Sequence, residues 1–183
     1  AVYDPGTNKI FVFGGFDSGG FAQAQIVKYD PIAHSVQASL GLLPTARSHT
    51  SAAYSPAAAR IYVFGGKQFG LGPHLASIVE FNPASEGVVN VSTTLPSGRI
   101  ETAAAYDPAS GDILVFGGNA TGTWLTDVVA FHPAGSSTTL LSPLPSPRAA
   151  MAAVRHPLTG RVYLYGGETA GTPSAEVLEF DPD

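Results

Sequence analysis

Cysteine is absent from the 183 residues. The chain can therefore form no disulfide, thiolate nucleophile, iron–sulfur cluster or Cys-ligated zinc site, but a cysteine-free chain fits any redox compartment. Charged residues are scarce at 13%, and 9 Lys and Arg stand against 14 Asp and Glu. Binding to a phosphate backbone needs clustered basic residues, so we expect no nucleic acid partner.

Long hydrophobic runs are also missing. No segment approaches the roughly 20 consecutive apolar residues of a membrane-spanning helix. The first residues, Ala-Val-Tyr-Asp-Pro, lack the basic and apolar regions of a secretory signal. We therefore expect a soluble chain without membrane insertion, and its compartment stays open. Two triplets, starting at Asn90 and Asn119, have the form of N-glycosylation sequons whose use depends on that compartment.

Glycine and proline, by contrast, are plentiful and regularly placed, with 21 and 15 copies. A Gly pair recurs about every 50 residues, which is the sign of an internal repeat. The pairs are Gly14-Gly15, Gly65-Gly66, Gly117-Gly118 and Gly166-Gly167. With 44% apolar residues the chain can also bury a sizeable core.

Each repeat contains four segments typical of strands and none typical of a helix. An apolar run precedes each Gly pair, and its β-rich composition predicts a strand buried on both faces. These runs are 10–13, 61–64, 113–116 and 162–165. A second strand ends in an aromatic residue and a turn, at Tyr29-Asp30-Pro31, Phe81-Asn82-Pro83, Phe131-His132-Pro133 and Phe180-Asp181-Pro182.

The other two strands of each repeat are an alanine-rich strand and a weaker strand that leads into a short motif. Alanine-rich strands lie upstream of each turn at Tyr54-Ser55-Pro56, Tyr106-Asp107-Pro108 and Arg155-His156-Pro157. A weaker fourth strand, near residues 36–40, 88–91 and 138–141, leads into a Leu-Pro-x-x-Arg motif. Its copies end at Arg47, Arg99 and Arg148.

Together these motifs resemble the kelch repeat of β-propellers over the entire chain. The resemblance implies an all-β, kelch-type β-propeller of about four four-stranded blades, near residues 1–47, 48–99, 100–148 and 149–183, with the last one incomplete. The chain departs from the family pattern at the outermost strand, which usually contains a Trp. The corresponding residues here are Val36, Val88 or Val89, and Thr138 or Thr139. Because kelch propellers most often have six blades, we expect a fragment of a larger ring whose remainder is a partner; a four-bladed ring is the alternative.

The glycines and arginines have structural interpretations. No helix follows the Gly pairs, so a phosphate-binding loop is disfavoured, and we expect positive φ angles with close backbone approach. The arginines could bind an acidic ligand or brace adjacent blades through carbonyl groups. Their recurrence at one register favours the brace.

Antiparallel order places the longer loops on one face, here called the loop face, and the Asp-Pro-like turns on the opposite turn face. The loop face contains loops 16–24, 67–75, 119–126 and 168–175 with segments 41–48, 93–100 and 142–149. Loops on a rigid scaffold usually carry function.

In kelch proteins that bind peptides, contacts follow the Arg and the Gly pair. The resemblance therefore implies partner-binding roles for Ser48, His49, Ile100, Glu101, Phe16, Lys67, Asn119 and Glu168, and also for Ala149 and Ala150 as shape alone. Phe69 and Trp124 are further candidate anchors in these loops, and so is Phe21, although packing onto its own blade is favoured for the two Phe.

We expect a non-catalytic module that docks a protein or peptide on the loop face, with no cofactor, metal or catalytic residue. The alternative is an epimerase-like enzyme or sugar binder that uses an axial pocket. His49, His74 and Glu101 could form a two-His, one-carboxylate metal site, but nothing in their spacing requires it. The Tyr–Cys chemistry of kelch-like radical oxidases is excluded because Cys is absent.

Overall fold

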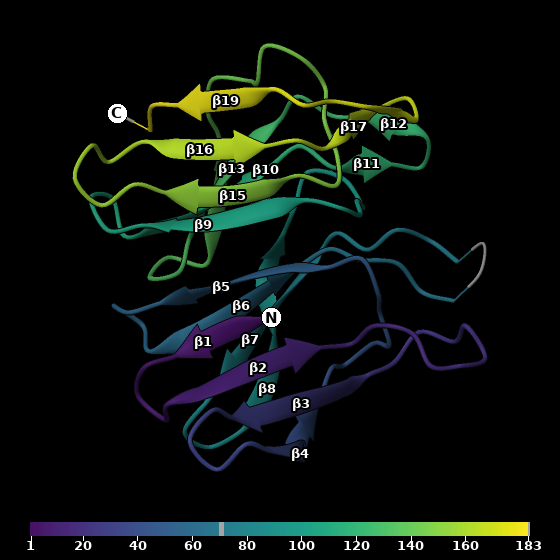
Figure 1. Cartoon of the computed structure of the whole chain (residues 1–183), viewed down its shortest axis with the longest axis vertical. Coiled ribbons are helices and arrows are strands. Elements are labelled where there is room, and N and C mark those ends of the chain that lie inside the picture. The colour runs from purple at the N-terminus through teal and green to yellow at the C-terminus, as the bar shows by residue number, and fades with distance from the viewer. Residues whose placement is uncertain (70–71, 183) are drawn as a thin grey trace.

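The computed structural model describes residues 1–69 and 72–182. Gly70 and Leu71, in the predicted loop 67–75, and Asp183, in the predicted final turn, lie outside the described residues. Within the described part, strands are the only regular structure (Figure 1). They form four main antiparallel sheets and two short hairpins. The chain is therefore all-β, as its sequence predicts.

The main sheets are assembled from strands that follow one another in sequence. The first contains β1 (Val2–Asp4), β2 (Lys9–Phe13), β3 (Gln25–Asp30) and β4 (Ser35–Leu42). The second contains β5 (Ser51–Ser55), β6 (Arg60–Phe64), β7 (Ser77–Asn82) and β8 (Gly87–Thr94). The third contains β9 (Ala103–Asp107), β10 (Asp112–Phe116), β13 (Val128–His132) and β14 (Ser137–Leu140). The fourth contains β15 (Ala152–Arg155), β16 (Val162–Tyr165) and β19 (Val177–Phe180).

The hairpins interrupt two of the predicted loops. They are β11 (Asn119–Ala120) with β12 (Thr123–Trp124), and β17 (Glu168–Thr169) with β18 (Thr172–Pro173). The sequence predicts irregular loops at these positions. Both hairpins turn at a left-handed residue followed by glycine, Thr121-Gly122 and Ala170-Gly171, which is the backbone that a tight hairpin needs.

The sheets lie side by side in chain order, with their first strands meeting. β5 contacts both β1 and β9, and β9 contacts β15 (Figure 1). Small side chains such as Ala53 and Ala103, both buried, allow this approach. The predicted alanine-rich strands therefore lie where neighbouring sheets come together.

Three core layers fill the spaces between consecutive sheets. In the second, third and fourth sheets, the aromatic residue near the end of the third strand reaches into the preceding sheet. Phe81 packs edge-on against Phe11 and Phe13, with ring centroids 4.9 and 5.4 Å apart. Phe131 packs in the same way against Tyr62, at 5.0 Å. The repeated aromatic position is thus an inter-sheet contact.

The Gly pairs have the expected positive φ angles and close backbone contacts. Gly65 and Gly117 have φ of 60° and 51°. A Cβ on Gly65 would lie 2.4 Å from the Arg99 carbonyl oxygen, and one on Gly117 would lie 2.2 Å from that of Arg148. Any larger residue would push the Leu-Pro-x-x-Arg segment away.

One expectation needs correction at both ends of the stack. All four apolar runs were predicted to be buried on both faces, and β6 and β10 are. Val12 on β2 is 40% exposed and Tyr165 on β16 is 47% exposed, because the first and last sheets have a neighbour on one side alone. Among the described residues there is no helix that could span a membrane.

Candidate functional site

On the loop face, a backbone pair ties the opening segment of each later repeat to its Gly-pair loop. In each pair, the residue after the arginine bridges the residue after the next Gly pair. The pairs are Ser48 with Lys67, Ile100 with Asn119, and Ala149 with Glu168. The structure therefore brings these predicted residues together two by two, along one face of the molecule. Phe16, after the first Gly pair, bridges Ala22 in its own loop.

The buried arginines fix these segments in place. Arg47 Nη1 donates to the Gly65 carbonyl at 3.0 Å, and Arg148 Nη1 donates to that of Gly166 at 3.1 Å. Arg99 makes the same bond to Gly117 at 3.4 Å. All three guanidinium side chains are buried, so they brace adjacent sheets as predicted and are not presented to a ligand.

Two residues after each arginine, the backbone is left-handed. His49, Glu101 and Ala150 have φ of 55°, 58° and 55°. Their backbones form a chain of hydrogen bonds, from the Glu101 amide to the His49 carbonyl at 3.0 Å and from the Ala150 amide to the Glu101 carbonyl at 2.9 Å. A left-handed conformation at a residue other than glycine costs energy and is common at binding sites. These positions form a row across the loop face.

A polar and aromatic cluster surrounds His49. Its Nδ1 lies 3.0 Å from Ser48 Oγ, and its Nε2 lies 3.9 Å from Glu101 Oε1. The Phe16 ring packs edge-on against the imidazole at 5.3 Å between centroids. Four predicted contact residues thus form one cluster, and Phe16 remains 49% exposed.

An aromatic pair extends from the first two loops. The rings of Phe21 and Phe69 are stacked, with centroids 4.4 Å apart and planes 20° apart. Both stay about half exposed, at 53% and 52%. The sequence favours packing of each Phe onto its own blade. That expectation is wrong, because the two rings pack on each other and stay half exposed.

No family model matches the chain, and no curated protein matches its sequence.

The remaining candidates have mainly structural contacts. Trp124 is half buried in β12, and its Nε1 is a buried donor without a hydrogen-bond partner among the described residues. The Thr121 amide donates to His74 Nδ1 at 3.0 Å, and the same nitrogen lies 3.1 Å from the Asn119 carbonyl oxygen. His74 is thus used to tie two loops together.

The structure does not assemble the possible metal site. His49 approaches Glu101, but His74 is held by the third repeat. Across residues 1–69 and 72–182 no group of three or more His, Asp or Glu side chains is arranged to hold a metal ion.

Proposed function

We propose that the chain is a kelch-type β-propeller segment in which each main sheet is a blade. The consecutive four-stranded order and the meeting of the first strands support this arrangement. So does the recurring arginine bond from each repeat to the next, which appears at Arg47, Arg99 and Arg148.

We further propose that more repeats of the same kind pack on the end sheets. In the second and third sheets, the second glycine of the pair faces the segment that follows the arginine and leads out of the preceding repeat: a Cβ on Gly66 would lie 2.8 Å from Ser48 O, and one on Gly118 would lie 2.7 Å from Ile100 O. A Cβ on Gly15 would meet nothing within 4 Å. The first sheet thus offers the same docking shape to a preceding repeat.

The function we propose is a non-catalytic scaffold that docks a protein or peptide on the loop face. The observation that carries it is the exposed Phe21–Phe69 stack beside the Phe16–His49 cluster. Half-exposed aromatic rings already ordered by their neighbours present apolar area at little entropic cost on binding, which is typical of interface anchors.

Selection of a phage-displayed random peptide library on the immobilised chain tests this proposal. The selected peptides should bind the Phe21→Ala/Phe69→Ala double variant at least about tenfold more weakly, as expected for loss of an anchor. The thermal midpoint should hardly change, because both rings lie outside the core layers.

The matched control is Ile32→Ala/Leu158→Ala on the turn face, where the two side chains are 77% and 90% exposed. The peptides should bind this control as they bind the unmodified chain. Peptides that are insensitive to the loop-face change, or that are lost in the turn-face control, would show that the loop face is not the docking site.

A further inference from the structure

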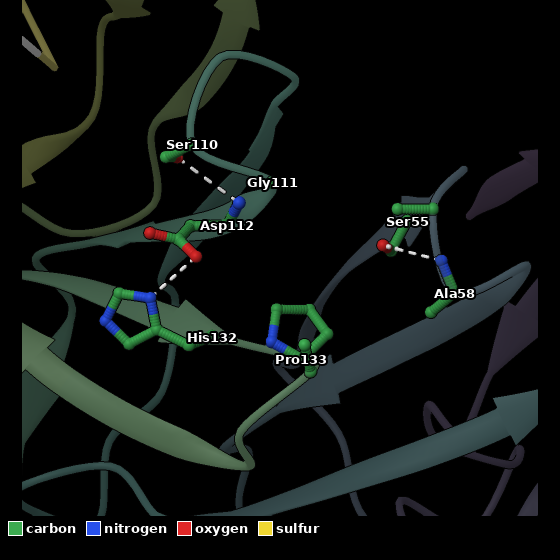
Figure 2. Close-up of a pocket in the computed structure, with 9 residues that line it drawn as sticks. Ser55, Ala58, Ser110, Gly111, Asp112, His132 and Pro133 are labelled. Atoms are coloured by element: carbon green, nitrogen blue, oxygen red, sulfur yellow. Dashed lines mark hydrogen bonds and ion pairs between the residues drawn. The ribbon is translucent and has the colours of Figure 1, made fainter.

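The turn face holds a cavity between the second and third sheets. Its volume is about 440 Å³, within the range of small-molecule sites. Three turns surround it, β5–β6, β9–β10 and β13–β14 (Figure 2). Ala57, Ala58, Pro133 and Ala134 supply apolar walls, whereas Asp112 and His132 supply the titratable groups.

The cavity lies where the third repeat departs from the others. The residue that enters the second strand is Lys9, Arg60 or Arg161 in the other repeats. These cations pair with carboxylates of the third strand, as in Arg60–Glu80 at 3.3 Å and Arg161–Glu179. In the third repeat the acidic and basic residue types exchange positions. Asp112 takes the cation's place, and its Oδ1 lies 2.6 Å from His132 Nδ1 (Figure 2).

A second departure borders the same space. Asp4 and Asp107 each accept hydrogen bonds that cap the turn after the first strand. Ser55 stands at this position in the second repeat, is fully buried, and accepts one bond from the Ala58 amide at 3.4 Å. Both departures replace a longer side chain with a shorter one. The space therefore comes from these substitutions and is not a general consequence of the repeat.

The carboxylate of Asp112 gives the cavity its charge. His132 is already engaged on both nitrogens, with Asp112 on Nδ1 and Thr139 Oγ1 at 3.0 Å from Nε2. The neighbouring charges are paired elsewhere, Asp107 with Arg155 at 3.1 Å and Arg60 with Glu80. An ionised carboxylate has about four lone-pair sites, so Asp112 can accept further bonds.

We propose that this cavity binds a small organic cation, namely a primary amine with a compact apolar body. The ammonium group bonds Asp112, and the apolar body lies against Ala57, Ala58 and Pro133. An anion would be repelled by the carboxylate.

NMR titration at pH 8 with three matched probes tests the proposal. Benzylamine should shift the amide signals of Ser110, Gly111 and Asp112 saturably, at least about tenfold more tightly than neutral benzyl alcohol. Benzoate should produce no saturable shift. The absence of a saturable benzylamine shift, or equal binding of either other probe, overturns the proposal. Tenfold tighter binding of Nα-acetyl-lysine methylamide also overturns it, because the cavity would then recognise a lysine side chain.

Two variants locate the site. Asp112→Asn keeps the size and removes the charge, so benzylamine should bind it no better than benzyl alcohol does. Asp112→Arg restores the residue type of Arg60 and Arg161 and should fill the cavity. The matched control is Asp30→Asn, a turn-face carboxylate outside the cavity, which should leave benzylamine binding unchanged. Unaltered affinity in Asp112→Asn would refute the assignment, whether or not Asp112→Arg folds.

Discussion

The three bracing arginines differ in what their outer nitrogen contacts. Arg99 Nη2 donates to Asp127 at 2.9 Å, and Arg148 Nη2 pairs with Glu176. Ser77 occupies the corresponding position at the start of the third strand for Arg47, whose Nη2 is buried without a hydrogen-bond partner in the described chain. Burial lowers the pKa of Arg47 to about 10. An unmet donor of this kind lowers stability.

We predict that Ser77→Asp stabilises the protein. The new carboxylate would stand where Asp127 stands in the third repeat and accept from Arg47 Nη2. Because the guanidinium is buried already, the added charge-assisted bond should raise the free energy of unfolding by about 1 kcal/mol. Urea unfolding at pH 7 measures it. Gln25→Asp, at the same position of the first sheet, where no arginine is placed, should give no gain; equal effects would mean that Arg47 is not the cause.

At the scale of elements, the β7–β8 turn fastens the second sheet to the first. Glu86 in this turn pairs with Lys28 and accepts hydrogen bonds from the Ser39 hydroxyl, at 2.9 Å, and from the Leu40 amide. Burial raises the pKa of Glu86, but the bonds from Lys28, Leu40 and Ser39 outweigh it and hold the pKa below its ordinary value. The ionised form is therefore favoured in the folded state.

We predict an acid-sensitive contribution from this contact. A carboxyl group whose pKa is lower in the folded state stabilises the fold above its unfolded pKa, about 4.3 for Glu. That stability is lost as the pH falls through the folded pKa. Glu86→Gln should lower the free energy of unfolding by about 1 kcal/mol at pH 7, with a smaller difference at pH 3. Denaturant melts at both pH values measure this.

The control for this prediction is Glu179→Gln, in an exposed pair with Arg161 whose two side chains are each 43% exposed. Exposed pairs contribute little, so its effect should stay small at both pH values. If Glu86→Gln lowered the free energy of unfolding equally at both pH values, the ionic explanation would be wrong. The loss would then come from packing alone.

The strand positions and the bracing role of the arginines could be predicted from the sequence. Residues that recur at the same position of successive repeats have the same structural role. The site was harder to predict. The pairing of Ser48 with Lys67 follows from the repeat, but the Phe21–Phe69 stack depends on the paths of two dissimilar loops. The sequence does indicate something unusual at Asp112, because the other repeats have a cation at this position. The volume of the cavity depends on side-chain packing and could not be predicted.

At the scale of the whole molecule, the stack of sheets has two exposed end faces. Val12 and Tyr3 lie exposed on the first sheet. Val154, Tyr165 and Val177 lie exposed on the last, at 56%, 47% and 54%. Contiguous apolar surface of this kind promotes association.

We predict that the 183-residue chain self-associates through these faces. Light scattering over a range of concentrations should show mass rising above the 18.8 kDa of one chain. Val12→Lys combined with Tyr165→Lys should shift the distribution toward single chains, because each lysine places a charge in an apolar face. A compact single chain at every concentration would contradict this prediction and favour a closed four-bladed ring.

The core layers between consecutive sheets also determine how the molecule comes apart. Each layer joins two sheets that are neighbours in sequence, so the stack resembles a one-dimensional array with nearest-neighbour coupling. Folding can start at any layer and spread in both directions. A force applied at the two termini would unfold the outer sheets before the inner ones. The amide hydrogens of β6 and β10 would be the last to exchange with solvent.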